Sequence, residues 1–243
     1  MSEWISSPAL IAMLLIFLGS FVQTAIGFGL AVVAAPLLFM ISPDYVPAPI
    51  TITALFISLL SALKHRSSVE LGGLKMALIG RIPGSLAGGV LLVMVSTQLL
   101  SLWLGLLVLF AVAVSLLPFR VEPTPRRMAI AGFFSGFFGT SSAIGGPPMA
   151  LLLQHQEANQ LRGNLSAFFV FSSIISLLIQ WPAGHLTLHH LWLTIPLIPA
   201  AWLGYKLAVL TTQSLPKQKI RYGALGLCLI SGITAVYNGV ING

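Results

Sequence analysis

The chain has 243 residues, 57% of them hydrophobic and 7% charged, and its mean hydropathy is +0.98. Soluble domains carry about 25% charged residues, so the composition excludes an ordinary soluble protein. It predicts an integral membrane protein with room for roughly eight to ten crossings. The formal net charge of +7 does not predict a nucleic-acid partner, because the basic residues lie mainly in short loops between apolar segments, as topology signals at the cytoplasmic leaflet do.

Ten apolar segments follow one another along the chain. They run approximately over residues 8–26, 28–41, 47–63, 72–95, 98–117, 128–139, 141–154, 163–181, 188–210 and 221–240. No basic residues precede the first segment and no clear small-residue cleavage site follows it, so we expect a membrane segment and not a removed signal peptide. The single cysteine, Cys228, excludes an internal disulfide and a multi-cysteine metal site, and no cofactor is expected.

Two stretches, 21–36 and 133–148, resemble each other and place glycines, hydroxyls and a proline inside apolar sequence. They match at one offset of 112, which pairs Phe21 with Phe133, Gly27 with Gly139 and Pro36 with Pro148. In lipid, such a stretch is where a helix breaks and its backbone ends become available to a ligand. We therefore predict a first membrane repeat over 1–119, a cytoplasmic linker over 120–127 and a second repeat over 128–243.

Loop charges predict the orientation of the two repeats. The loop 64–66 carries Lys64 and Arg66, whereas its counterpart over 181–190 has no lysine or arginine; conversely, 95–98 is uncharged and its counterpart carries Lys217, Lys219 and Arg221. If basic loops face the cytoplasm, equivalent loops face opposite sides. The predicted fold is thus an all-α polytopic membrane protein of two inverted-topology repeats, each with about five apolar helices or half-helices. The glycine-rich arms, broken or re-entrant, would meet near mid-membrane.

The chain resembles the TauE/SafE sulfite exporter family, also called the toluenesulfonate uptake permease family. The resemblance covers nearly the whole chain and depends on the arms Gly19–Pro36 and Gly132–Pro148, with the stretch from Pro83 to Gly88 as a second support. The first arm departs from the glycine-richer family pattern in having Phe28 and Leu30 around Gly29. The resemblance implies export or uptake of sulfite, organosulfonates or related small organosulfur anions.

The charged residues independently favour an anion as the ligand. The carboxylates all fall at predicted loops or segment ends: Glu3, Asp44, Glu70, Glu122 and Glu157. Carriers of cations use carboxylates buried in the membrane, so their absence from the segments disfavours a cation pump. Arg81 lies well inside the segment 72–95. Its guanidinium either binds an oxyanion in a polar cavity or reaches the membrane interface along its own stem.

The arms supply most of the predicted substrate-binding residues. Broken helix starts present backbone N–H groups to an anion, and neighbouring hydroxyls and amides add donors. The predicted set is Gln23, Thr24, Gly27, Gly29, Arg81, Ser135, Gly139, Thr140, Ser141, Ser142, Gly145 and Gly146. The rival interpretation of each glycine is close helix packing.

The histidines and the glutamine at 180 are predicted to lie at the edges of the membrane. The adjacent pair His189 and His190 points to different faces of a helix, so it is a poor metal clamp and a solvated role is favoured; a proton relay stays open. Gln180 and Trp181 are typical of an interfacial helix end with an aromatic anchor.

The function expected from these patterns is secondary transport by alternating access, with export favoured, of small sulfur-containing anions. The partners are the anion and the lipid bilayer, in the cell inner membrane; a homodimer is left open. The alternatives are an uptake permease for another small anion or metabolite, and a non-transporting membrane assembly protein. An intramembrane enzyme is not expected, because the sequence lacks a His/Cys metal set, a glycine-framed nucleophilic serine and paired buried carboxylates.

Overall fold

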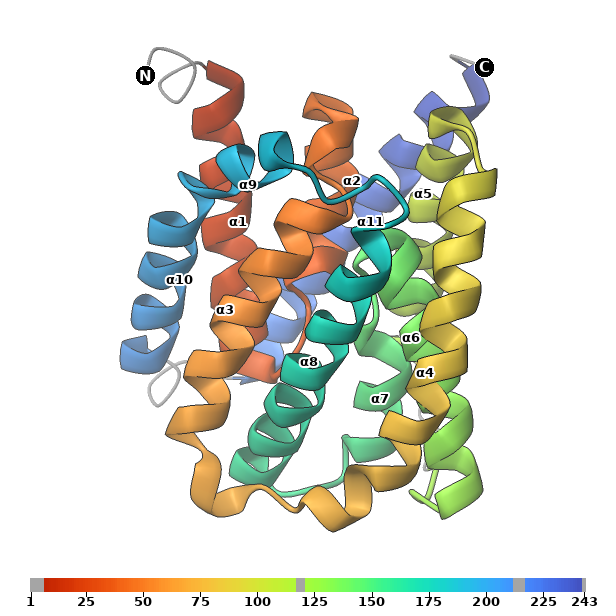
Figure 1. Ribbon diagram of the computed structural model, residues 1–243. Coiled ribbons are helices and arrows are strands. Elements are labelled where there is room, and N and C mark those ends of the chain that lie inside the picture. Colours follow the sequence, from red (N-terminus) through yellow and green to blue (C-terminus); the bar gives the residue numbers. More distant parts are fainter. Residues whose placement is uncertain (1–6, 117–120, 212–216, 242–243) are drawn as a thin grey trace.

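The computed structural model describes residues 7–116, 121–211 and 217–241 (Figure 1), and every regular element in these ranges is a helix. The α-helices are α1 (Ser7–Ile26), α2 (Leu30–Ile41), α3 (Ala48–Lys64), α4 (Leu71–Met94), α5 (Thr97–Leu116), α6 (Pro125–Ser142), α7 (Gly146–Leu153), α8 (Ala158–Gln180), α9 (Leu188–Thr194), α10 (Leu197–Thr211) and α11 (Lys217–Ile241), and two short 3₁₀ helices are η2 (Pro43–Tyr45) and η3 (Arg66–Ser68). The prediction of an all-α polytopic membrane protein is confirmed. Arg120 and the side chains of Lys217, Lys219 and Arg221 lie outside the described residues.

The number of helices long enough to cross a bilayer is smaller than the length of the chain would allow. Within the described ranges, four helices qualify, or five if the bent pair α9–α10 counts as one span. This count among the described residues is below the roughly eight to ten crossings expected, in part because some apolar pieces are short: α2 has 12 residues and α7 has eight. The chain is nonetheless a multi-pass membrane protein.

Corresponding helices of the two halves run in opposite directions in Figure 1. From the N terminus at the top, α1 descends whereas α6 ascends; α3 descends and α8 ascends. The main helix pairings join one half to the other: α4 packs along α6, α1 along α10, α3 along α8 and α5 along α11. The two halves are therefore interlocked and not side by side. An exact two-fold relation between them stays a prediction.

The tightest of these pairings, α4 against α6, depends on glycine. A Cβ atom at Gly80, Gly84 or Gly88 would collide with the backbone carbonyl of Ala129, Phe133 or Phe137, respectively. From the other side, Gly132 and Gly136 leave the same room for the backbone of α4. Small residues let two backbones approach this closely in a membrane, so the rival interpretation of these glycines as packing residues holds for this pair.

Each arm is a helical hairpin with a break at its tip. In the first hairpin, α1 ends at Ile26 and α2 begins at Leu30; Gly27 and Gly29 between them have φ of 96° and 120°, which glycine adopts most readily. In the second hairpin, α6 continues to Ser142, so the break lies at residues 143–145 and not near residue 140 as the predicted segments had it. The chain turns there at Ala143, in the left-handed region with φ of 64°.

The hydroxyl groups in the last turn of α6 are compatible with a helix that continues past its predicted end. Ser141 Oγ donates to the carbonyl of Phe137 at 2.7 Å, and Ser142 Oγ donates to that of Phe138 at 2.6 Å. Both side chains thus bond back to their own helix, as serine can without ending it. The predicted segment 188–210 is instead divided, because the chain bends by 40° between α9 and α10 at Pro196, which has no N–H to donate.

Candidate functional site

The side chain of Arg81, on α4, is buried in the middle of the molecule. It is 2% exposed, so it does not reach the membrane interface. Its Nη1 donates to the carbonyl oxygen of Ser135 at 2.7 Å and to the Oγ at 2.9 Å. Its Nη2 donates to the carbonyl of Ser172 at 3.2 Å and to Ser176 Oγ at 2.8 Å. The close approach of α4 and α6 brings Ser135 to the guanidinium, and α8 supplies the other two serines.

Among the described residues, no negative charge balances this guanidinium. All four acceptors are neutral oxygens, and the one ion pair found within the described ranges joins His189 to Asp44 elsewhere. The Nε of Arg81 is buried without a hydrogen-bond partner. A buried charge without a counter-charge is destabilising, and a bound oxyanion is the ligand that matches a guanidinium fork.

A small cavity of about 50 Å³ lies beside the guanidinium. This volume exceeds the roughly 10–15 Å³ that one water molecule needs on the same kind of measure, and it suits an ion of a few heavy atoms. The cavity lies where the two hairpins meet α3, α4 and α8; its lining includes Gln23, Phe28, Gly29, Thr51, Arg81, Gly139, Gly145, Gly146, Phe169, Ser172, Ser173 and Ser176.

Eight of the twelve predicted substrate-binding residues lie at this site. Six line the cavity directly: Gln23, Gly29, Arg81, Gly139, Gly145 and Gly146. Two more join it through hydrogen bonds: Ser135 accepts from Arg81, and Thr140 Oγ1 lies 2.9 Å from Ser176 Oγ. Most of the residues that were predicted from their position near the two breaks therefore do belong to the cavity or to its hydrogen-bonded surroundings.

The other four predicted residues are not part of the cavity wall. The hydroxyl of Thr24 donates to the carbonyl of Ser20 at 2.8 Å, within its own helix. The hydroxyls of Ser141 and Ser142 likewise bond back into α6, and Ser141 also accepts from the indole of Trp103 at 3.3 Å. A Cβ at Gly27 would lie 3.0 Å from Leu165 Cδ1, on the lower side of the break. These four residues instead form hydrogen bonds within their own helices or pack against neighbouring side chains.

Glycine lets the second hairpin touch the guanidinium. A Cβ at Gly139 would lie 2.8 Å from Arg81 Nη2, and one at Gly145 would lie 3.1 Å from Nη1. Ser135 Oγ donates to the carbonyl of Gly145 at 2.6 Å. One serine therefore connects Arg81 to the break that follows α6, so the position of the charge and the shape of the break depend on each other.

Sequence reasoning missed the polar face of α8. Ser172, Ser176 and Gln180 follow one another at four-residue intervals, which places them on one face of the helix. Gln180 was expected at an interfacial helix end, but its side chain is fully buried and Nε2 donates to the carbonyl of Thr140 at 3.0 Å. This regular polar spacing in an apolar helix was the signal that could have revealed the third wall of the site.

The two breaks also differ in their backbone donors. Pro147 and Pro148 follow the start of α7 and have no N–H groups, so this helix offers fewer donors than predicted. The start of α2 has no proline and no side-chain cap, and Gly29, Ala31 and Val32 of this region line the cavity. The helix start that best matches the predicted anion ligand is therefore that of α2.

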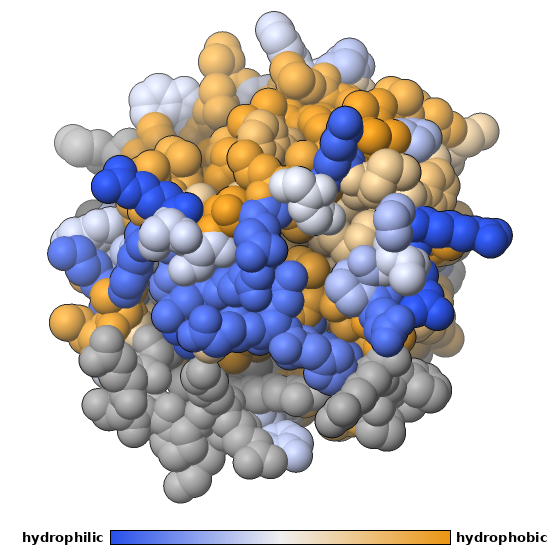
Figure 2. All heavy atoms as spheres, turned by 90° about the horizontal axis from the view of Figure 1, so that it is seen from below, coloured by the Kyte–Doolittle hydropathy of each residue, from blue (hydrophilic) through white to orange (hydrophobic). Residues whose placement is uncertain are grey.

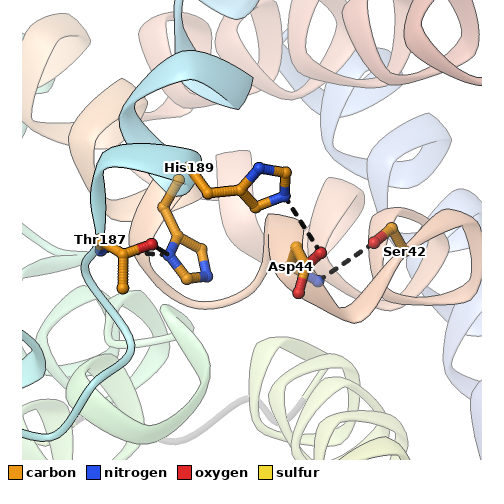
Figure 3. Close-up of polar contacts among 5 residues, drawn as sticks. Ser42, Asp44, Thr187 and His189 are labelled. Atoms are coloured by element: carbon orange, nitrogen blue, oxygen red, sulfur yellow. Dashed lines mark hydrogen bonds and ion pairs between the residues drawn. The ribbon is translucent and has the colours of Figure 1, made fainter.

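A separate polar contact joins the two halves at the upper end of the molecule. Figure 3 shows His189 of α9 facing Asp44 of η2, with Nε2 3.3 Å from Oδ2. The two side chains are 63% and 52% exposed, so the pair is worth little in stability. The solvated role expected for His189 agrees with this exposure, and no group of three or more candidate metal ligands occurs among the residues that the structure describes.

Comparison with known proteins identifies the family. The model of the family described as "Sulfite exporter TauE/SafE" matches residues 12–235, which include the breaks of both hairpins and every wall of the cavity. No curated protein and no solved structure matches the chain. The matched family consists of membrane transporters and not enzymes. The match spans most of this polytopic helical chain, which therefore belongs to the TauE/SafE sulfite exporter family.

Proposed function

We propose that this protein is a secondary transporter that exports a small sulfur-containing oxyanion, such as sulfite or an organosulfonate, through the cavity beside Arg81. The observation that carries the proposal is the buried guanidinium whose four partners are all neutral oxygens. In transport, the anion would supply the missing negative charge. Sulfite and sulfonate groups present two or three oxygens to a guanidinium fork, which suits bidentate binding.

Several contacts support a role for both hairpins in holding the anion. The second hairpin positions Arg81 through Ser135 and Gly145, and the first presents the start of α2 to the same cavity. Backbone amides at that start carry partial positive charge. The anion would therefore be held between a full charge on one side and a helix start on the other.

The distribution of basic residues supports an orientation for the transporter. At the lower end in Figure 1, where α3 joins α4 and where α6 begins, the described chain carries Lys64, Arg66, Arg126 and Arg127. At the upper end, the connections at 42–47, 95–96 and 181–187 carry no lysine or arginine. By the positive-inside rule, the lower end faces the cytoplasm, and the protein would lie in the cytoplasmic membrane.

Export of an anion from a cell needs no separate coupling ion. A membrane potential of 100 mV, negative inside, drives each negative charge outward by about 2.3 kcal/mol. Rocking of the interlocked halves around the cavity would expose the anion first to one side and then to the other. A potential-dependent flux is the kinetic signature of this mechanism.

The test is efflux of sulfite, methanesulfonate, sulfate and phosphate from proteoliposomes under an imposed potential. We expect wild-type protein to release the sulfur anions faster than empty vesicles do, and Arg81→Gln to abolish this flux. Arg66→Gln is the matched control, because it removes the same charge from an exposed residue and should leave the flux unchanged. Equal flux from wild-type and empty vesicles for every anion would refute the proposal, and preference for phosphate would favour a carrier of a different anion.

A further inference from the structure

A second and much larger cavity lies below the tip of the first hairpin. Its volume is about 480 Å³, within the range of sites for organic ligands. Its lining comes from α1, α2, α5, α7, α8 and α11, and much of it is apolar, including Val22, Val33, Val112, Leu151, Leu165 and Cys228. A bare oxyanion such as sulfite would leave most of this larger cavity unfilled.

The lower face of the molecule is polar around this region. Seen from below in Figure 2, hydrophilic residues gather in a band across the middle of the face, with apolar atoms above and beside them. Gln156 and Arg162, both near the start of α8, line the cavity at this end. The cavity therefore combines apolar walls with polar groups on the side proposed to face the cytoplasm.

Among the described residues that line this cavity, Arg162 is the one with a charged side chain. Its Nε and Nη2 donate to the carbonyl of Ala25, at 3.1 and 2.6 Å. No carboxylate pairs with it in the part of the chain that the structure describes. Lys64 and His65 lie near enough to interact with its charge, so this end of the cavity is positive.

Phe28 lies between this cavity and the one beside Arg81. Phe28, Gly29 and Val32 line both cavities. The side chain of Phe28 also contacts the second hairpin, since a Cβ at Gly146 would lie 3.1 Å from its Cβ and 3.2 Å from its Cδ2. One aromatic ring at the tip of the first hairpin thus separates the two spaces and touches both hairpins.

We propose that the lower cavity is a second anion site, in which Arg162 holds the anionic group of an organic acid and the apolar walls hold its carbon body. The ligand class is a sulfonate or carboxylate with an aromatic ring or a short alkyl chain. Phe28 separates this site from Arg81, so the ligand would pass the ring to reach the cavity beside Arg81. The proposal rests on the proposed function for its direction of movement, but the binding itself does not.

The test is calorimetric binding of benzenesulfonate, methanesulfonate and sulfite to the full-length protein in phosphatidylcholine nanodiscs. We expect benzenesulfonate to bind at least roughly tenfold more tightly than methanesulfonate, because burial of the ring adds apolar contact, and with a negative heat-capacity change. Arg162→Gln should weaken benzenesulfonate binding about tenfold or more. Arg66→Gln, an exposed arginine of the same end, should leave it unchanged.

A second variant guards against misfolding of Arg162→Gln, which also loses the hydrogen bonds to Ala25. Leu151→Asn makes one wall polar without changing the charge, so it should weaken benzenesulfonate and leave methanesulfonate unaffected. Equal affinity for the three anions, or an Arg162→Gln variant that folds and binds benzenesulfonate normally, would overturn the proposal. Loss of benzenesulfonate binding when phosphatidylglycerol is added would assign the cavity to a lipid headgroup and would also overturn it.

The same material separates this proposal from the proposed function. Arg81→Gln should abolish efflux and retain benzenesulfonate binding in the lower cavity. If no anion is transported but benzenesulfonate binds through Arg162, the second site stands and the transport proposal fails. If efflux is intact but binding depends on neither Arg162 nor Leu151, transport stands and the second site fails.

Discussion

The two hairpins share a sequence pattern but contribute different chemistry. The second hairpin, α6–α7, surrounds Arg81: Ser135 accepts its hydrogen bonds, and Gly139 and Gly145 lie against its guanidinium. The first, α1–α2, has an aromatic ring at its tip, and Gln23 bonds to Ser58 at 3.1 Å instead of to the arginine. The two hairpins thus share a break in the helix, while the side chains around each break determine whether it holds a charge or separates two cavities.

The largest effect is expected where α4 meets the second hairpin. Gly84→Ala places a Cβ against the carbonyl of Phe133, so the helices must separate, and overpacking of this kind costs about 1–3 kcal/mol. Gly72→Ala is the matched control on the same helix, because nothing lies within 4 Å of its Cβ. We expect Gly84→Ala to lower Tm by several degrees and to reduce efflux, and Gly72→Ala to leave Tm equal or higher.

Thermal unfolding of the two detergent-purified variants checks this prediction. If Gly84→Ala were as stable as Gly72→Ala, α4 and α6 would not be in close contact. The position of Arg81 beside Ser135 would then have no support.

Gly27 and Gly139, which are paired at the offset of 112, should respond differently to replacement by alanine. Gly139→Ala brings a Cβ to within 2.8 Å of Arg81 Nη2, so it should displace the guanidinium and weaken sulfite binding about tenfold or more. Gly27→Ala forces alanine into φ of 96°, which costs of the order of 1–3 kcal/mol in stability. It should leave sulfite affinity nearly unchanged, since Gly27 does not line the cavity beside Arg81.

Calorimetry with sulfite and thermal unfolding of both variants give the comparison. The result that contradicts it is the reverse pattern, with affinity lost in Gly27→Ala and stability lost in Gly139→Ala. Equal loss of affinity in both would mean that the two breaks hold the anion alike.

Much of this architecture could be predicted from the sequence. Hydropathy gave the helical membrane protein, and the glycine and proline pattern located both breaks to within a few residues. The break after α6 was misplaced because Ser141 and Ser142 bond to their own helix, and sequence alone does not tell a hydroxyl that faces a ligand from one that bonds back.

The environment of Arg81 could be predicted only in part. Its position inside an apolar segment indicated an anion site, but the serines that hold it come from α6 and α8, 54 to 95 residues away along the chain. Such long-range contacts depend on how the helices pack. The lower cavity was not predicted at all. Arg162 lies close to the expected start of a helix, where a basic residue is usually interpreted as a topology signal.

A smaller effect is expected at the matched positions Ser135 and Gln23. Ser135→Ala removes one acceptor from Arg81 and the bond to the carbonyl of Gly145, and should weaken sulfite binding by about threefold to tenfold. Gln23→Ala removes a bond to Ser58 that does not involve the arginine, so affinity should fall by roughly twofold or less. Initial rates of efflux against sulfite concentration give both values, and a larger loss in Gln23→Ala would reverse the assigned roles of the hairpins.

The smallest effect concerns the lower end of the first hairpin, where Arg162 bonds to Ala25. Burial and the positive charges of Arg162 and Lys64 lower the pKa of His65. Because the folded protein then binds a proton less readily than the unfolded chain, this histidine costs no stability above its unfolded pKa of about 6.5. It destabilises the fold increasingly as the pH falls below that value. Tm should therefore fall slightly between pH 7.5 and 5.

His65→Gln should reduce this fall in Tm, whereas His155→Gln, an exposed histidine at the same end, should not. Arg162→Gln should also reduce it, because it removes one of the charges that oppose protonation of His65. By the same linkage, an anion bound at Arg162 would favour the protonated histidine, so benzenesulfonate should protect Tm more at pH 5.5 than at pH 7.5. Equal protection at both values would show that the anion binds beyond the reach of His65, and would place it beside Arg81 instead of at the base of the first hairpin.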